Sequence, residues 1–231
     1  MENPKFLSPI LLGTLYIVAM PIGNLEDISL RALRVLGEVE IVLAEDARVT
    51  REFLANYQLS TTVITYGRRD SEDVLHQMLT LLKSGKSVAL VSDAGTPAIA
   101  DPGLLLIQET LKIGVNVRAI PGANAALVAL LLSGFPSGRF IFEGFPPRSQ
   151  LERQAFFQNL ADESRTIILY ESPRFLRSTL RDLCVVLGED RSAMIGFDLT
   201  KLTEKLFRGT LAEMRAEFTR KKIRAETGRR P

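Results

Sequence analysis

Small and turn-forming residues follow the apolar run 88–91 without a break, as Ser92-Asp93-Ala94-Gly95-Thr96-Pro97. A short apolar run that ends in this way predicts a buried parallel strand whose carboxyl end opens into a loop. So little side-chain bulk lets backbone N–H and C=O groups reach a small ligand, and Asp93 adds one fixed acceptor. The alternative is a turn between a strand and a helix that binds nothing.

Three further apolar runs end in the same kind of loop. Residues 15–19 lead into Met20-Pro21-Ile22-Gly23-Asn24-Leu25, residues 115–120 into Pro121-Gly122-Ala123-Asn124, and residues 166–169 into Tyr170-Glu171-Ser172-Pro173. None of the four loops matches the G-x-G-x-x-G dinucleotide pattern or the G-x-x-x-x-G-K-[ST] phosphate loop. The four loops therefore favour a small ligand without phosphates.

Apolar strand-like runs alternate with helical patterns in the first half of the chain. We expect strands at 14–19, 41–44, 62–66, 87–91 and 115–120, and helices at 28–36, 50–57, 71–83 and 104–113. This alternation predicts the α/β class, with a parallel sheet that helices cover on both faces.

A Gly- and Pro-rich break at 133–138 follows a helix expected at 125–132 and opens a second set of elements. We expect strands at 140–143, 166–170, 193–198 and 205–207, and helices at 151–161, 174–187 and 211–218. The sequence predicts two α/β domains, 13–121 and 122–218, with a cleft between them that gathers the four loops. A basic tail, 219–231, is expected to be disordered, either as a solvated segment or as an arm that reaches RNA.

The composition is that of an ordinary globular protein, with 231 residues, 46% of them apolar, and a net charge of +2. No apolar run approaches the ~20 residues of a membrane span, and no secretory signal begins the chain, so we expect a cytoplasmic protein with no membrane partner. The single cysteine, Cys184, lies in an apolar stretch and is expected to be a buried, inert thiol.

The loops stand among motifs that occur together in one family. These are Gly13-Thr14-Leu15-Tyr16-Ile17-Val18-Ala19, Pro21-Ile22-Gly23-Asn24-Leu25, Ala44-Glu45-Asp46 with Arg48, residues 91–97, Ile120-Pro121-Gly122, Phe142-Glu143-Gly144-Phe145, Tyr170-Glu171-Ser172-Pro173, Leu199-Thr200-Lys201 and Arg208-Gly209-Thr210-Leu211. Over residues 13–218 the chain resembles the ribosomal RNA small-subunit methyltransferase I family of the tetrapyrrole methylase superfamily.

This resemblance implies a two-domain enzyme that transfers a methyl group from S-adenosylmethionine to the ribose 2′-hydroxyl of a cytidine in the decoding region of 16S rRNA. Its partners would be 16S rRNA or the small ribosomal subunit, and a second copy of the chain in a homodimer. The implied cofactor-binding residues lie on the four loops: Pro21, Gly23, Asn24, Asp93, Ala94, Gly95, Thr96, Pro121, Gly122, Ala123, Tyr170, Glu171 and Ser172.

Methyl transfer from a sulfonium centre is an in-line displacement, which needs alignment of donor and acceptor but no metal. The lone histidine and the absence of C-x-x-C and H-E-x-x-H patterns set aside a His/Cys metal site. A nearby base or cation would assist the acceptor hydroxyl. The candidates are Asp46 and Arg48 at the end of run 41–44 and Lys201 in the second domain, with an ion pair or helix cap as the alternative for each.

The absence of histidines that are common in relatives leaves other interpretations open. Relatives commonly carry histidines after the Glu-Asp-x-Arg run and in the following segment, whereas this chain has Val49 and Tyr66-Gly67-Arg68-Arg69-Asp70, and its only histidine, His76, is expected on a helix surface. A cofactor-binding homologue without activity is therefore an alternative, as is a superfamily methylase with a tetrapyrrole or another small acceptor. The candidates for an RNA footprint are Arg68, Arg69, Arg148, Arg153 and the trio Arg174, Arg177 and Arg181, which would share one helix face. The alternative is that they are ordinary solvent-exposed arginines.

Overall fold

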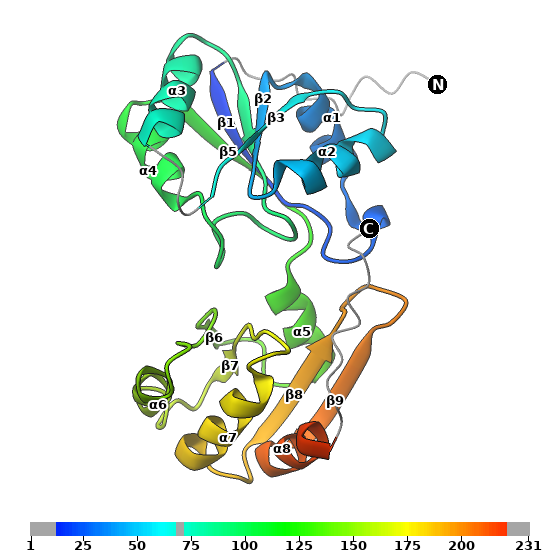
Figure 1. Ribbon diagram of the computed structural model, residues 1–231, viewed down its shortest axis with the longest axis vertical. Coiled ribbons are helices and arrows are strands. Elements are labelled where there is room, and N and C mark those ends of the chain that lie inside the picture. The colour runs from blue at the N-terminus through cyan, green and yellow to red at the C-terminus, as the bar shows by residue number, and fades with distance from the viewer. Residues whose placement is uncertain (1–12, 68–71, 221–231) are drawn as a thin grey trace. The chain divides into compact units, whose positions relative to one another are not determined.

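The computed structural model describes residues 13–67 and 72–220, and it divides between Asn124 and Ala125 into two compact units (Figure 1). The first unit alternates strands and helices along the chain. Its elements are β1 (Thr14–Val18), a short 3₁₀ helix (Leu25–Asp27), α1 (Leu30–Glu38), β2 (Ile41–Ala44), α2 (Ala47–Asn56), β3 (Thr62–Thr65), α3 (Glu72–Lys83), β4 (Val88–Leu90), α4 (Leu104–Lys112) and β5 (Asn116–Ile120).

The five strands of the first unit form one parallel sheet in the order β3-β2-β4-β1-β5. The predicted α/β class with a parallel sheet is confirmed. Strands β1, β2 and β4 are buried along their whole length, as expected for central strands covered on both faces.

Two hydrophobic cores cover the two faces of this sheet. On one face α1 and α2 bury Val35, Leu36 and Leu54 against the sheet, and on the other α3 and α4 bury Met78, Leu82 and Leu106. Figure 1 shows the two helix pairs on opposite sides of the strands. This arrangement is the doubly wound layering that the alternating pattern predicts.

Side-chain caps fix helix starts that the apolar pattern placed differently. Helix α2 begins at Ala47, three residues before the predicted start, because Asp46 caps it: its carboxylate accepts hydrogen bonds from the N–H groups of Arg48 and Val49. Helix α1 begins at Leu30 because the Ser29 hydroxyl oxygen accepts a hydrogen bond from the N–H of Ala32. Hydrophobic periodicity finds the buried face of a helix, whereas the cap decides where the helix begins.

The second unit contains four helices and two pairs of strands among its described residues. They are α5 (Ala125–Ser133), β6 (Phe140–Phe142), α6 (Gln150–Gln158), β7 (Thr166–Ile168), α7 (Leu176–Leu187), β8 (Ser192–Phe197), β9 (Lys205–Thr210) and α8 (Leu211–Arg220). Strands β6 and β7 pair in parallel, and β8 and β9 pair as an antiparallel ribbon. Helices α6, α7 and α8 enclose a core that includes Phe157, Leu180 and Phe218.

The start of α7 and the end of α8 in the second unit differ from the sequence prediction. Helix α7 begins at Leu176, so Arg174 precedes the helix. The prediction that Arg174 shares a helical face with Arg177 and Arg181 is therefore wrong. Helix α8 continues to Arg220, so Thr219 and Arg220 are helical and do not belong to a tail. The rest of the predicted tail, 221–231, and the pair Arg68 and Arg69 lie outside the described residues.

A buried ion pair joins α6 to α7. The Nε and Nη2 atoms of Arg153 lie 2.8 and 2.5 Å from Oδ2 of Asp182, and both side chains are at most 3% exposed. The remaining Nη1 of Arg153 donates to the backbone carbonyls of Pro147 and Arg148. The prediction that Arg153 contributes to an RNA footprint is therefore wrong, because its guanidinium is enclosed by protein groups.

Removing one partner of this pair should destabilise the second unit strongly. In the Asp182→Ala variant the Arg153 guanidinium is left buried without its counter-charge, and we expect a loss of about 3–5 kcal/mol in the free energy of unfolding, measured by urea denaturation. The matched control is Glu38→Ala, which breaks the exposed Arg34–Glu38 pair and should cost less than about 1 kcal/mol. Equal losses in the two variants would contradict the structural role of the buried pair.

Candidate functional site

The carboxyl ends of β1 and β4 meet at the point of the sheet where ligand crevices form in α/β folds. From β1 the chain passes through α1 toward β2, and from β4 it passes through α4 to β5, on the other side of β1. The two connections therefore leave adjacent strands in opposite directions. Such a switch point opens a crevice at the carboxyl edge of the sheet.

Two loops at this switch point are joined by their backbones. We name them the β1 loop (residues 19–29) and the β4 loop (residues 91–103). The N–H of Met20 donates to the carbonyl of Gly95 at 2.8 Å, and the N–H of Gly95 donates to the carbonyl of Met20 at 3.0 Å. This isolated antiparallel bridge closes the two loops over the strand ends.

Gly95 is required at this bridge for two separate reasons. Its φ of +74° lies in the left-handed region, which side chains disfavour. A Cβ at this position would also lie 3.3 Å from Cγ2 of Ile22 and 3.7 Å from the carbonyl oxygen of Ala123. Sequence analysis identified Gly95 but missed Met20 and Ile22, which look like ordinary apolar residues.

Hydroxyl groups tie the β4 loop to itself and to the β5 loop, residues 121–124. Ser92 Oγ lies 3.1 and 3.3 Å from the carbonyl oxygens of Ala94 and Gly95, and Thr96 Oγ1 donates to the carbonyl of Ala123 at 3.3 Å. The β4 loop also holds Ala98 and Ala100 at φ values of +66° and +64°. Non-glycine residues in this conformation cluster at ligand sites, where the surrounding structure enforces it.

The end of β2 is held to the β4 loop by Asp93. Its Oδ1 accepts a hydrogen bond from the N–H of Asp46 at 3.1 Å, while Asp46 Oδ1 accepts from the N–H of Arg48 at 2.9 Å. Thus Asp46 and Arg48 lie beside Asp93 at the carboxyl edge of the sheet, as predicted for a candidate site. The helix-cap alternative also holds for Asp46, because its carboxylate caps α2.

The remaining predicted residues of the first unit lie on the same edge. The backbones of the β1 and β5 loops run so close together at Gly122 that a Cβ there would lie 3.0 Å from Cβ of Ala19. Asn24 caps the 3₁₀ helix by accepting from the N–H of Glu26 at 3.1 Å, and Pro21 is buried. The structure therefore brings the three loops of the first unit together on one edge: Pro21, Gly23, Asn24, Asp93, Ala94, Gly95, Thr96, Pro121, Gly122 and Ala123.

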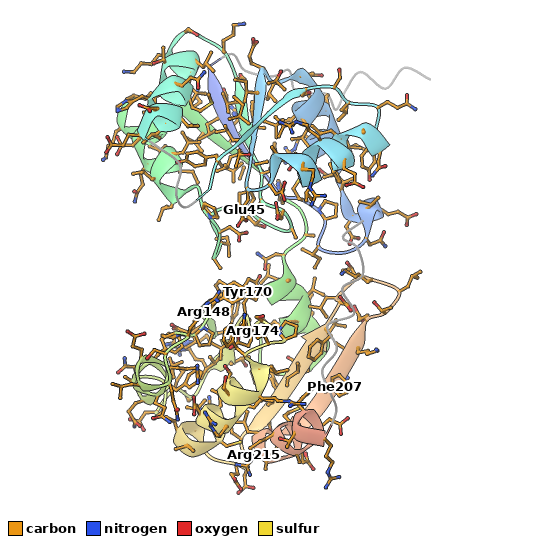
Figure 2. The ribbon with its side chains drawn as sticks, viewed as in Figure 1. Glu45, Arg148, Tyr170, Arg174, Phe207 and Arg215 are labelled. Carbon is orange, nitrogen blue, oxygen red and sulfur yellow. The ribbon has the colours of Figure 1, made fainter. Side chains whose placement is uncertain are left out.

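The fourth predicted loop belongs to the second unit, where it follows β7. The Tyr170 hydroxyl accepts a hydrogen bond from the N–H of Ala126 at the start of α5, and its ring lies 4.9 and 5.5 Å from the rings of Phe142 and Phe145. Glu171 accepts hydrogen bonds from the N–H of Ser172 and from the hydroxyl of Thr179 on α7. Tyr170, which is labelled in Figure 2, and Glu171 therefore fix the loop against its neighbours.

Lys201 lies in the turn between β8 and β9. Its Nζ is 3.0 Å from Oδ1 of Asp198, and both side chains are about 40% exposed. The turn holds Asp198 and Thr200 at φ values of +50° and +68°, and the Thr200 hydroxyl is buried without a hydrogen-bond partner. The ion-pair alternative holds for Lys201, and its catalytic role stays a prediction.

Two residues that sequence analysis set aside are placed as expected. His76 is exposed on α3. Cys184 is buried on α7, and burial raises the pKa of its thiol, so the thiolate is disfavoured.

Metal-binding and membrane-spanning features were sought over residues 13–67 and 72–220. Within these ranges no group of three or more His, Cys, Asp or Glu side chains is arranged to hold a metal ion. No helix within them is long and apolar enough to cross a membrane.

Solved structures of several methyltransferases share this fold. The structure of the cobalamin biosynthetic enzyme cobalt precorrin-4 methyltransferase matches with a TM-score of 0.67 at 19% identity, covering 90% of this chain and 89% of that one. Uroporphyrin-III C-methyltransferase from Thermus thermophilus, complexed with S-adenosyl homocysteine, matches with a TM-score of 0.61 at 18% identity, covering 89% and 91%. At these identities the likeness establishes the fold.

Sequence comparison identifies the family. The Tetrapyrrole (Corrin/Porphyrin) Methylases match residues 14–215. The ribosomal RNA small subunit methyltransferase I of Thermotoga maritima is 44% identical over 211 residues, which cover 91% of this chain and 94% of that protein. The protein of the same name from Synechocystis sp. is 44% identical over 90% of this chain and 75% of its own length. The chain belongs to the ribosomal RNA small subunit methyltransferase I family within the tetrapyrrole methylases.

Proposed function

We propose that this enzyme transfers the methyl group of S-adenosylmethionine to the ribose 2′-hydroxyl of a cytidine in the decoding region of 16S rRNA. The observation that carries the proposal is 44% identity over nearly the whole length of a ribosomal RNA small subunit methyltransferase I. The tetrapyrrole methyltransferases share the fold at only 18–19% identity, so they give no comparable support for a tetrapyrrole acceptor. The homodimer, the cytoplasmic location and the use of an assembled ribosomal subunit stay predictions.

The charge of the three loops in the first unit supports S-adenosylmethionine as the donor. The β1, β4 and β5 loops contain four carboxylates, on Glu26, Asp27, Asp93 and Asp101, and no Lys or Arg. S-adenosylmethionine carries a sulfonium cation and no phosphate. A ligand with a positive centre is electrostatically compatible with such loops, whereas a nucleotide phosphate is not.

The reaction needs alignment above all. The 2′-oxygen attacks the methyl carbon opposite to sulfur, the carbon–sulfur bond breaks, and neutral sulfur leaves as S-adenosylhomocysteine while the hydroxyl proton passes to a base or to water. We propose that the hydrogen-bonded loops hold the donor. Asp46 is the proposed base, and Arg48 and Lys201 are proposed to stabilise the developing negative charge on the 2′-oxygen.

Purified protein should methylate 16S rRNA from cells that lack this enzyme. After incubation with S-adenosylmethionine, nucleoside mass spectrometry of the digested rRNA should detect one 2′-O-methylcytidine per 16S molecule above the untreated control. Heat-denatured protein is the negative control. A methyl group on a base, or no methylation while the protein binds S-adenosylmethionine, would overturn the proposed reaction.

Donor binding at the β4 loop can be tested with two glycine variants of equal backbone strain. Gly95 and Gly114 both have a φ of +74°, but only at Gly95 would a Cβ meet other groups within 4 Å. Both Gly→Ala variants should lose about 1–2 kcal/mol of stability. Only Gly95→Ala should weaken S-adenosylmethionine binding, by at least tenfold in calorimetry. Equal affinities would remove Gly95 from the donor site.

The proposed catalytic roles are separable from the structural ones. Asp46→Asn keeps a good helix cap but removes the charge, and Lys201→Gln removes the cation from an exposed ion pair. Each should lower the single-turnover methylation rate by roughly 10²-fold with little change in donor affinity or melting temperature. Lys112→Gln is the matched control, because Lys112 also forms an exposed i,i+3 pair, with Glu109. Rates within a few-fold of the control would assign Asp46 and Lys201 to structure alone.

A further inference from the structure

A basic groove lies between α7 and α8 of the second unit. It has a volume of about 400 Å³, and we name it the arginine groove after the four arginines among its six lining residues: Arg174, Arg177, Ser178, Arg181, Arg215 and Thr219. Each of these six side chains ends in a guanidinium or a hydroxyl group. Both groups donate hydrogen bonds, and none of the described residues that line the groove carries a carboxylate.

Two carboxylates pair with arginines of the groove. Arg215 lies 2.6 Å from Oε1 of Glu189, and Arg181 Nε lies 3.4 Å from Oδ1 of Asp182. Asp182 already accepts two bonds from the buried Arg153. These ion pairs set three guanidinium groups, those of Arg153, Arg181 and Arg215, against two carboxylates.

A backbone carbonyl positions one of the groove arginines. Arg177 Nε donates to the carbonyl of Phe218 near the end of α8, and this hydrogen bond joins α7 to α8. Arg177 and Arg181 are one turn apart on the same face of α7, about 6 Å along its axis. Arg181 is 54% exposed, so its guanidinium is accessible from solvent.

One end of the arginine groove begins at the loop that follows β7, residues 170–173, which we name the β7 loop. Arg174 follows Tyr170-Glu171-Ser172-Pro173 directly, and its guanidinium lies 5.4 Å from the centre of the Phe175 ring. The guanidinium of Arg148 lies 5.1 Å from the same ring. Figure 2 shows Arg148 and Arg174 next to Tyr170, with Arg215 at the other end of the unit. The basic surface therefore runs from a predicted site loop along α7 to α8.

We infer that the arginine groove binds the phosphates of the rRNA strand that carries the acceptor cytidine. This inference rests on the proposed function, because it assigns the substrate of that reaction to a surface. Guanidinium groups bind phosphate with two parallel hydrogen bonds, and several in a row follow a sugar–phosphate backbone. The part of this track nearest Tyr170 consists of Arg148, Arg174 and the ring of Phe175. At this end of the track a base stacks or a phosphate binds.

The test compares two pairs of Arg→Gln substitutions with the same change in charge. Arg174→Gln with Arg181→Gln alters the groove and spares Arg177 and Arg215, whose contacts join or cap α8. The control pair, Arg139→Gln with Arg165→Gln, lies directly before β6 and β7, at the strand ends opposite the Tyr170 loop. Binding of unmodified 16S rRNA transcript is measured by filter binding from 0.05 to 0.4 M KCl, and S-adenosylmethionine affinity by calorimetry.

The groove pair should bind the transcript at least tenfold more weakly at 0.1 M KCl than the control pair. The slope of log affinity against log salt should fall by about 1.4–1.8, because each lost phosphate contact removes about 0.7–0.9. S-adenosylmethionine affinity should be unchanged in both pairs, which also reports that they are folded. The lysine variant, Arg174→Lys with Arg181→Lys, should restore most of the slope, because lysine keeps the positive charge.

The two proposals fail in different ways. If the groove and control pairs bind the transcript with the same affinity and salt slope, the groove inference is overturned, while methylation by the unmodified chain still supports the proposed function. If the unmodified chain binds the transcript through the groove but transfers no methyl group to it, the proposed function is overturned. If the lysine variant fails to regain the salt slope, the loss came from altered packing and the phosphate track is refuted.

Discussion

The antiparallel bridge between Met20 and Gly95 is the constraint on which the candidate site of the first unit depends. It joins loops that follow two adjacent parallel strands, and Thr96 extends the connection to the β5 loop through the carbonyl of Ala123. The two N–H groups of the bridge each donate to the carbonyl of the other residue. The absence of a side chain at Gly95 is what allows this approach, because a Cβ there would press against Ile22 and the carbonyl oxygen of Ala123. Gly95 is therefore required by the contact between the loops, independently of any ligand.

The buried pair of Arg153 and Asp182 has the corresponding role in the second unit. Burying two charges costs desolvation energy that their attraction only partly offsets, so a pair of this kind is weak evidence for stability. Its geometry suggests positioning instead. Arg153 also donates to the carbonyls of Pro147 and Arg148, and these bonds fix the backbone of that segment. The Arg148 guanidinium, on the same segment, lies over the ring of Phe175. A buried arginine thus positions an exposed one.

Sequence patterns predicted the fold class, the parallel sheet and the loops of the candidate site, because each depends on local chemistry. Apolar runs of the right length mark the central strands, and small residues after them mark the loops. The patterns failed where the deciding contact is distant in sequence. Nothing local distinguishes Arg153 from Arg148, yet Asp182, 29 residues away, buries the first. The hydrogen bond from the Asp46 N–H to Asp93 spans 47 residues, so no local pattern predicts it either.

The net charge of +2 conceals a separation that the structure makes visible. The β1, β4 and β5 loops carry carboxylates and no basic side chain, which suits a sulfonium cofactor, while the arginine groove between α7 and α8 presents guanidinium groups, which suit a polyanion. An enzyme that performs the proposed reaction must keep its cationic cofactor and its polyanionic substrate from competing for one surface. Placing the two charge types on different compact units meets that requirement, because each electrostatic surface is then built from the elements of its own unit.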